Sequence, residues 1–276
     1  MSGLSHRLDV LRRHPRPWRF LAGRGLALSG LCERLIIRQN GYRLRFYPSN
    51  LSEILFVFPA FREADLAFFR AFLRVGDHVV DVGANIGDVA ALACSIVGPS
   101  GHVCAIEPHP RIFRYLQGNL ALNGFSWATA INAGAGAEEG AATIEDDRRD
   151  DMNRVGGDGL EIRIRRLDDL LPAGGRIELM KLDVEGYELF ALRGATATLD
   201  RVDCLHFECS ETLSARFGYR AQAVVDLLRD RGFAILRVVA PGALADFESL
   251  RADEVCNLVA ARDRRALIER TGWRIA

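Results

Sequence analysis

Apolar runs alternate with helical patterns through the middle of the chain, beginning near Gly76. The run at residues 78–82 precedes an amphipathic pattern over 87–97, and the run at 102–106 precedes another over 110–122. Short apolar runs bounded by turn residues predict buried strands, and apolar positions three and four apart predict helices. Strands that alternate with helices in this way favour a parallel sheet with helices on both faces.

The second half of the chain continues the alternation. It predicts strands at about 127–133, 177–183, 202–209, 233–239 and 255–261, and helices at 188–199 and 220–231. The last two strands are joined through Pro241-Gly242 without a helix of crossover length, so we expect the final strand to insert antiparallel to its neighbour. The sequence therefore predicts an α/β fold with a doubly wound, mostly parallel, seven-stranded sheet.

The N-terminal stretch differs from the rest. Residues 1–40 carry many arginines among Leu, Trp and Phe, and we interpret them as a basic helical arm ahead of a domain that spans 41–276. The arm either packs on the domain with a solvated basic face, which we favour, or lies on an anionic membrane. Residues 42–47 alternate like a strand, and residues 59–73 predict a helix.

A break in the rhythm follows the third strand. Residues 134–160 contain the charge run Glu145–Asp151 and a cluster of glycines. This composition is typical of a solvated loop, and we keep a lid that closes on substrate as the alternative. Residues 160–167 alternate with arginines and predict an exposed strand.

Composition narrows the class of protein. The 276 residues include 36 basic and 36 acidic side chains, so the net charge is zero and no nucleic-acid partner is expected. The six cysteines form no CxxC pair, which favours buried thiols in a reducing compartment. We find no secretory or membrane-spanning pattern and expect a cytoplasmic protein.

The strand-to-helix turn after residue 80 carries the first chemical signal. Asp81 ends a β-branched run, and Gly83 and Gly87 follow it around Asn85. Glycines allow a ligand to approach the backbone closely, and the N–H groups at a helix N-terminus suit an anionic group. Glu107 ends the second strand, where an acid accepts hydrogen bonds from ribose hydroxyls. Together they predict a nucleoside cofactor.

Further polar residues follow the other strands at the same predicted edge of the sheet, where ligands of open α/β folds bind. They are Asn132, Ala133, Asp183 and Glu208. Lys181, the one lysine of the chain, shares a strand face with Asp183 and needs a partner such as that carboxylate. A structural ion pair and a catalytic role remain equally open for it.

Several motifs, taken in order from about residue 75 to 209, resemble the FkbM-type family of methyltransferases. These motifs are Asp81-Val-Gly-Ala-Asn85-Ile-Gly87, Ala105-Ile-Glu107-Pro108, Leu167-Asp168-Asp169-Leu170, Lys181-Leu-Asp183-Val-Glu185-Gly186-Tyr-Glu188 and Leu192-Arg-Gly194-Ala195. The resemblance implies a class I, Rossmann-like methyltransferase fold with S-adenosylmethionine as cofactor. It also implies a small hydroxylated acceptor, such as a sugar or a secondary metabolite, that is methylated on oxygen.

The resemblance also implies roles for single residues. Residues 81–87 of the glycine turn would hold the methionine part of the cofactor, with Asp81 near its ammonium group, and Glu107 would bind its ribose. Asn132 and Ala133 would lie beside the adenine, and Asp183 would lie where cofactor and acceptor meet. Methyl transfer to a hydroxyl needs a base, for which Asp183 is our first choice, ahead of Glu208 and Lys181.

A metal-assisted reaction and two other enzyme classes are the alternatives to this interpretation. A divalent cation held by Asp183 and Glu208 could lower the pKa of the hydroxyl instead, but we expect no metal. An RNA ribose methyltransferase shares the chemistry, although the single lysine excludes a tetrad with two lysines. An NAD(P)-dependent oxidoreductase would need a GxGxxG turn, which the chain lacks. Oligomeric state is not predicted.

Overall fold

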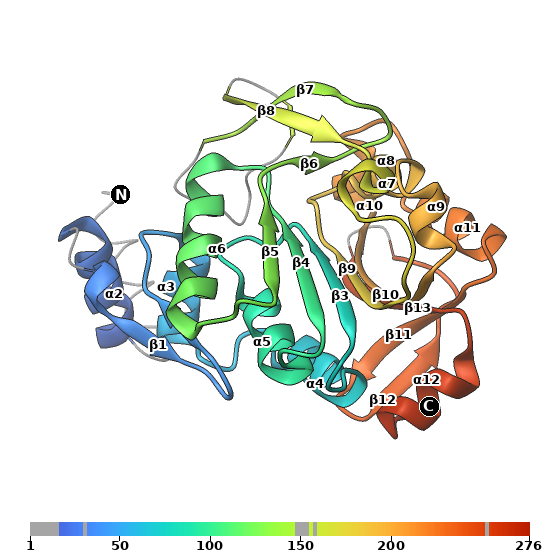
Figure 1. Cartoon of the computed structure of the whole chain (residues 1–276), viewed down its shortest axis with the longest axis horizontal. Helices are drawn as coiled ribbons and strands as arrows, with labels where there is room; N and C mark the ends of the chain where they lie inside the picture. The colour runs from blue at the N-terminus through green and yellow to red at the C-terminus, as the bar shows by residue number, and fades with distance from the viewer. Residues whose placement is uncertain (1–16, 30–31, 147–154, 157–158, 252–253) are drawn as a thin grey trace, which may run out of the picture.

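The computed structural model describes residues 17–29, 32–146, 155–156, 159–251 and 254–276 (Figure 1). A nine-stranded sheet forms its centre. From one edge to the other its strands are β14 (Arg274–Ile275), β12 (Ala243–Asp246), β11 (Ala234–Ala240), β13 (Val255–Ala261), β10 (Val202–Ser210), β9 (Ile177–Leu182), β3 (His78–Val82), β4 (His102–Ile106) and β5 (Ala128–Ile131). The predicted α/β fold is confirmed.

Strand directions follow the prediction. The five strands from β5 to β10 are parallel to their neighbours, and β13 lies between β10 and β11, antiparallel to both. The predicted number of seven strands is too low because β12 and β14 extend the sheet beyond β11. These two strands have only four and two residues, too few for a periodic pattern to reveal.

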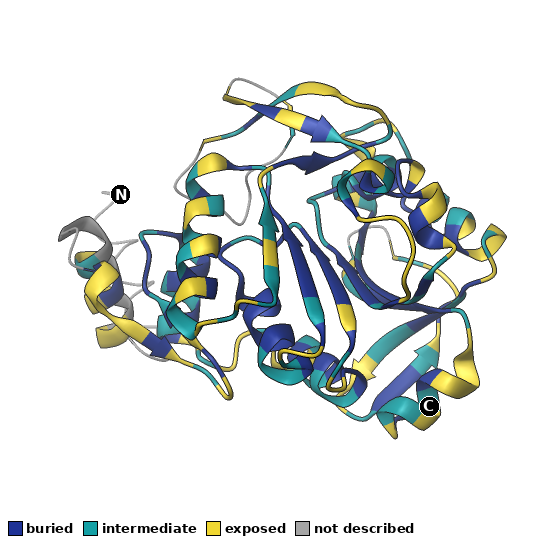
Figure 2. Cartoon of the chain, viewed as in Figure 1, coloured by how far each residue is buried: buried dark blue, intermediate teal, exposed yellow. Residues whose placement is uncertain are grey.

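Helices cover both faces of the sheet, as the alternation predicts. Neighbouring strand residues point to opposite faces, so Val79 and Val80 belong to different clusters of buried side chains. One face packs against α3 (Asn50–Val57), α4 (Glu63–Phe72), α5 (Asp88–Val97), α6 (Pro110–Asn123) and α12 (Arg264–Thr271). The other packs against α7 (Leu167–Leu170), α8 (Glu188–Arg193), α9 (Thr196–Leu199) and α11 (Gln222–Asp230), and α10 (Glu211–Ala215) follows β10. Figure 2 shows the central strands buried between these layers.

The helix predicted over 188–199 is divided in the structure. Asp168 accepts hydrogen bonds from the backbone N–H groups of Ala197 and Thr198 and from the hydroxyl of Thr196. A carboxylate bound to these N–H groups starts a new helix, so α8 ends at Arg193 and α9 begins at residue 196. The predicted single helix is therefore wrong at this point.

The stretch expected to be a loop contains strands. A separate three-stranded sheet is formed by β6 (Gly134–Ala135), β7 (Gly140–Ile144) and β8 (Leu160–Arg165). The strand predicted at 160–167 is confirmed, but Ile162 and Ile164 are buried with Ile144 in a small apolar cluster. Most of the charge run, from residue 147 onward, lies outside the described residues.

The N-terminal elements pack beside α6. They are α2 (Pro17–Ser29), the short 3₁₀ helix η1 (Cys32–Arg34), and a hairpin of β1 (Ile36–Arg38) and β2 (Arg43–Arg45). The expected division between residues 40 and 41 falls in the turn of this hairpin, and residues 1–16 lie outside the described part of the chain. The helix predicted at 59–73 begins later, at Glu63. Helix α3 ends at Val57, and residues 59–62 form the turn between the two helices.

Candidate active site

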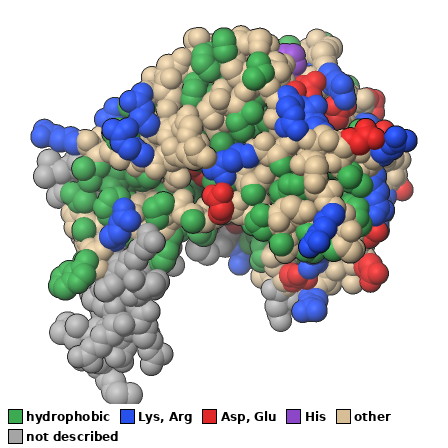
Figure 3. All heavy atoms as spheres, turned by 90° about the horizontal axis from the view of Figure 1, so that it is seen from below, with side chains coloured by type: hydrophobic (Ala, Val, Ile, Leu, Met, Phe, Trp, Pro, Cys, Tyr) green, Lys and Arg blue, Asp and Glu red, His purple; other side chains and the backbone are tan. Residues whose placement is uncertain are grey.

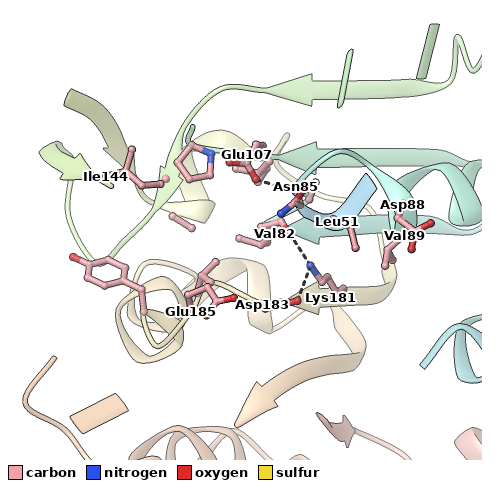
Figure 4. Close-up of a pocket in the computed structure, with 18 of the residues that line it drawn as sticks. Leu51, Val82, Asn85, Asp88, Val89, Glu107, Ile144, Lys181, Asp183 and Glu185 are labelled. Carbon is pink, nitrogen blue, oxygen red and sulfur yellow. Dashed lines mark hydrogen bonds and ion pairs between the residues drawn. The ribbon is translucent and has the colours of Figure 1, made fainter. Parts of the chain in front are cut away.

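A cavity of about 230 Å³ opens where β3, β4 and β9 end. Ligands of open α/β sheets bind at this edge. Of the predicted residues, six line the cavity: Gly83, Asn85, Glu107, Ala133, Lys181 and Asp183. Four others lie just outside the lining: Asp81, Gly87, Asn132 and Glu208. Figure 4 shows Asn85 and Glu107 at one end of the cavity, and Lys181 and Asp183 at another.

The glycine turn brings β3 close to β9. Gly83 has φ +77°, and a Cβ atom there would lie 1.8 Å from the backbone oxygen of Asp183. At Gly87 a Cβ would lie 2.6 Å from Leu116 Cδ1, so this glycine permits the close packing of α6. Of these two glycines, Gly83 lines the cavity, and contact of Gly87 with the cofactor stays a prediction.

Backbone strain is concentrated around the cavity. Within the described ranges, three residues other than glycine have a positive φ: Arg62, Asn85 and Glu185. All three line the cavity. Such conformations cost about 1–3 kcal/mol each and persist where the surrounding structure imposes them, which is most often at functional sites.

Glu107 is held in a defined orientation. Its Oε2 accepts the backbone N–H of Asn85 and its Oε1 accepts that of His109, both at 2.9 Å. Asn132 supports the same turn, since its Nδ2 donates to the backbone oxygens of Glu107 and Pro108. Asn132 thus acts on the turn and not on the cavity, whereas its neighbour Ala133 lines the cavity as predicted.

Lys181 lies between two carboxylates. Its Nζ is 3.3 Å from Asp81 Oδ1 and 3.3 Å from Asp183 Oδ2, and it donates a hydrogen bond to the backbone oxygen of Gly83 at 2.7 Å. Burial opposes its charge, but the two carboxylates outweigh burial and raise the pKa of Lys181. The predicted pairing of Lys181 with Asp183 is confirmed, and Lys181 stays protonated.

Asp81 faces Lys181 rather than the cavity. Its side chain is fully buried and does not belong to the lining. The cavity is instead lined by Asp88, the first residue of α5, which is 1% exposed and accepts a 2.5 Å hydrogen bond from Tyr42 Oη. Asp81 therefore reaches the cavity through Lys181, and its binding of the cofactor's ammonium group, directly or through water, stays a prediction.

Asp183 is held by two cations at one oxygen. Arg62 Nη2 donates to Asp183 Oδ2 at 2.7 Å, and Lys181 approaches the same atom. Although burial favours the neutral acid, Lys181 and Arg62 hold the pKa of Asp183 well below its usual range. Arg62 comes from the turn before α4 and belongs to no motif, so the sequence analysis missed it.

Glu208 completes an acidic cluster beside Asp183. One oxygen each from Asp183, Glu185 and Glu208 lie within 4.8 Å of one another. Burial, reinforced by the charge of Asp183, raises the pKa of Glu208 to about 9. Arg62 and Lys181 already bind Asp183 Oδ2, which reduces the negative charge that this cluster offers to a divalent cation.

The turn after Asp183 is fixed by a buried acid. Glu188 is 3% exposed, and its Oε1 accepts the backbone N–H groups of Val184 and Gly186. Burial raises the pKa of Glu188 to about 7, against the opposing effect of these N–H groups. Glu188 thereby holds Glu185 in its left-handed conformation at the cavity wall.

Comparison with known families decides the assignment. The sequence profile described as the Methyltransferase FkbM domain matches residues 81–235, more than half of the chain. The chain belongs to this family. It is a class I methyltransferase that depends on S-adenosylmethionine, and an acceptor of the methyl group is therefore implied.

Related methyltransferases occur in fungi and archaea. Methyltransferase sdnD of Sordaria araneosa is 28% identical over 252 residues, which cover 76% of this chain and 93% of that protein. Methyltransferase 1 of Beauveria bassiana is 28% identical, over 42% of this chain and 57% of its own. A protein-L-isoaspartate O-methyltransferase of Aeropyrum pernix is 35% identical, but over only 23% of this chain and 24% of its own.

Solved structures align with the chain at low identity. The methyltransferase FkbM of Methylobacillus flagellatus is 18% identical with a TM-score of 0.43, covering 91% of this chain and 60% of that one. An rRNA methylase homologue of Clostridium thermocellum is 14% identical with a TM-score of 0.47, covering 72% of this FkbM methyltransferase and 93% of that chain. With TM-scores below 0.5, they contribute nothing to the functional argument.

The cavity of this FkbM methyltransferase fits its cofactor. Among the residues that line it are four acids, Asp88, Glu107, Asp183 and Glu185, and two bases, Arg62 and Lys181. Four acids against two bases give a formal charge of −2, which favours a ligand that carries a sulfonium and an ammonium group. Glu107 would bind the ribose, and Gly83 and Asn85 would contact the methionine part.

Proposed function

We propose that the protein methylates a hydroxyl of a small molecule, a sugar or a secondary metabolite, on oxygen. The observation that carries this proposal is the pairing of Asp183 Oδ2 with both Arg62 and Lys181 at the cavity wall. Among the described residues, no hydrogen bond reaches Asp183 Oδ1. That oxygen can therefore accept the hydrogen of an incoming hydroxyl.

The three candidate bases differ in protonation. Lys181 is protonated because two carboxylates flank it, and Glu208 is neutral at pH 7 because its pKa is raised to about 9. Asp183 remains ionised, since Arg62 and Lys181 depress its pKa. Of the three, Asp183 alone carries an available lone pair at neutral pH, so we assign the role to it. Because its low pKa makes it a weak base, it acts chiefly by holding the hydroxyl in position.

The residues act chiefly by position. S-adenosylmethionine, when bound, supplies a methyl group on a sulfonium, which is activated for displacement. Asp183 Oδ1 would orient the hydroxyl oxygen for in-line attack and take its proton as the methyl group passes from sulfur to oxygen. The sulfur would leave as the neutral thioether of S-adenosylhomocysteine, and water would then remove the proton from Asp183. Arg62 and Lys181 fix the carboxylate, and such pre-orientation can lower a barrier by several kcal/mol.

An acceptor in RNA is the second candidate. It is disfavoured because the cavity lining has more acids than bases, which repels a phosphate backbone. The single lysine of the chain also excludes a two-lysine tetrad. Family membership and its cofactor remove the NAD(P)-dependent oxidoreductase from consideration.

Release of S-adenosylhomocysteine provides the test. Purified protein is incubated with S-adenosylmethionine and a panel of neutral sugars, glycosides and hydroxylated secondary metabolites, with single-stranded RNA as a parallel arm. We expect turnover on a neutral hydroxylated compound, with the product heavier by one methylene unit and methylated on oxygen. Turnover on RNA alone, or on a nitrogen or carbon acceptor alone, would refute the proposal.

A further inference from the structure

Charge is divided unequally along this neutral chain. Residues 1–45 contain ten arginines and two acids, a net charge of +8, which leaves −8 on residues 46–276. In the described part of this stretch, Arg19, Arg34, Arg38 and Arg43 are exposed. Figure 3 shows basic and apolar side chains without acidic ones on the side that carries the N-terminal elements, whereas basic and acidic side chains are mixed on the opposite side.

Exposed apolar side chains are concentrated in the same region. The described chain exposes ten large hydrophobic residues, and six of them lie between residues 18 and 61: Trp18, Leu21, Leu35, Ile36, Phe58 and Phe61. Trp18 is 81% exposed, more than any other. A solvated basic face has no need of an exposed tryptophan, whereas a membrane interface favours Trp together with Arg.

Helix α2 presents these residues in a regular stripe. Trp18, Leu21, Ala22 and Gly25 are all exposed at positions i, i+3, i+4 and i+7, so they share one helix face. The opposite side packs on α3, where Gly23 is buried against Phe56. The helix thus carries an outward apolar face that no described residue covers, flanked by the exposed Arg19.

We propose that α2 and the neighbouring basic hairpin form a docking surface for an anionic phospholipid membrane. The stripe of Trp18, Leu21 and Ala22 inserts at the level of the headgroups, and the arginines contact lipid phosphates and carboxylates. The described part of the chain contains no helix with the length and hydropathy of a membrane span. The net charge of +8 on residues 1–45 favours an anionic membrane over a neutral one.

The docking surface is connected to the catalytic cavity through α3. Helix α2 packs on α3, and Leu51 and Ile54 of α3 line the cavity. A protein docked through α2 would therefore receive its acceptor close to the lipid surface, and this consequence rests on the proposed methyl transfer. Docking itself does not depend on catalysis and is tested separately.

Vesicle binding tests the docking surface with the full chain. Co-sedimentation is measured with vesicles of phosphatidylcholine alone and of phosphatidylcholine mixed with phosphatidylserine. The fluorescence of Trp18 also reports vesicle binding directly. Trp273 is buried, and Trp127 is half-buried and donates a hydrogen bond to the backbone oxygen of Cys94, so neither is exposed to lipid as Trp18 is. We expect binding to the anionic vesicles only, weakened by salt, with a blue shift of emission that Trp18→Phe abolishes.

A pair of surface variants provides the control. The double variant Trp18→Ser/Leu21→Ser should weaken vesicle binding by about tenfold or more, because both apolar contacts are lost. Val239→Ser/Val255→Ser removes two exposed residues elsewhere and should leave binding unchanged. Equal binding to both vesicle types, equal loss in both double variants, or binding of polyuridylate without binding of vesicles would overturn the proposal, whatever the outcome of the methyltransferase assay.

Discussion

Arg62 and Asp183 are 121 positions apart in the chain, yet Arg62 Nη2 lies 2.7 Å from Asp183 Oδ2. This contact joins the turn before α4 to the carboxyl end of β9. Lys181 approaches the same oxygen at 3.3 Å, so two cations keep Asp183 ionised and leave Oδ1 for the acceptor hydroxyl. The elements that precede the family motifs therefore complete the reaction site.

Replacement of Asp183 should abolish turnover more than cofactor binding. Asp183→Asn keeps the shape of the side chain but cannot take a proton, so we expect kcat to fall by about a hundredfold or more. The Kd for S-adenosylmethionine, measured by calorimetry, should change far less than kcat. A kcat close to that of the wild type would show that Asp183 is not the base.

Loss of Arg62 should shift the acidic limb of the pH profile. Activity requires ionised Asp183, and Arg62→Gln removes one of the two cations that depress its pKa. Protonation then becomes easier, so the pH below which kcat declines should rise by about one unit or more. Arg62→Lys retains the positive charge and should shift the pH at which kcat declines by less. An unshifted profile in Arg62→Gln would contradict the role of Arg62.

Chelation should leave the reaction unaffected. The cluster of Asp183, Glu185 and Glu208 is a poor divalent-cation site, because Arg62 and Lys181 already bind Asp183 Oδ2. We expect the same kcat before and after dialysis against EDTA, with or without added Mg²⁺ or Mn²⁺. Loss of activity that a divalent ion restores would assign the cluster to metal-assisted chemistry instead.

Asp168 should stabilise the fold through the start of α9. Asp168→Ala removes hydrogen bonds to Thr196, Ala197 and Thr198, and we expect a loss of about 1–2 kcal/mol in the free energy of unfolding. These backbone bonds outweigh burial and lower the pKa of Asp168. The stabilisation is therefore present above the unfolded-state pKa and is lost as the pH falls through the folded-state value. Denaturant unfolding at neutral and acid pH measures both effects.

The neighbouring Asp169 supplies the control for that experiment. It is exposed and follows Asp168 in the same short helix. Asp169→Ala should change the stability by no more than about 0.5 kcal/mol, as is usual for surface positions. Equal destabilisation by the two substitutions would show that the carboxylate of Asp168 is not the origin of the break between α8 and α9.

The sequence predicted elements wherever a pattern was long and periodic. The strand at 255–261 has the predicted bounds, and its antiparallel insertion followed from the short connection at Pro241-Gly242. Among the site residues, Gly83 and Glu107 were found because a glycine turn and an acid at a strand end have a local chemical meaning. A single sequence therefore reveals the role of a residue where its neighbours in the chain define that role.

The errors arise where distant residues decide the structure. The division of the helix at 188–199 depends on Asp168, which lies about one helix and one strand earlier in the chain. Arg62 reaches the site only through the tertiary fold, and the pairing of β3 with β9 sets Lys181 directly beside Asp81. The close packing of Leu116 on Gly87 is likewise set by a distant residue. Such relationships cannot be read from spacing alone.

Titration of the protein with S-adenosylmethionine tests the central claim most directly. The carboxylate of Glu107 is oriented by Asn85 and His109 toward the cavity, so Glu107→Ala should weaken binding by more than about tenfold, or 1.4 kcal/mol. Glu138→Ala, at an exposed position, should bind like the wild type. NAD and NADP should give no heat of binding. Binding of a nicotinamide cofactor, or unchanged affinity for S-adenosylmethionine in Glu107→Ala, would contradict the site described for this FkbM methyltransferase.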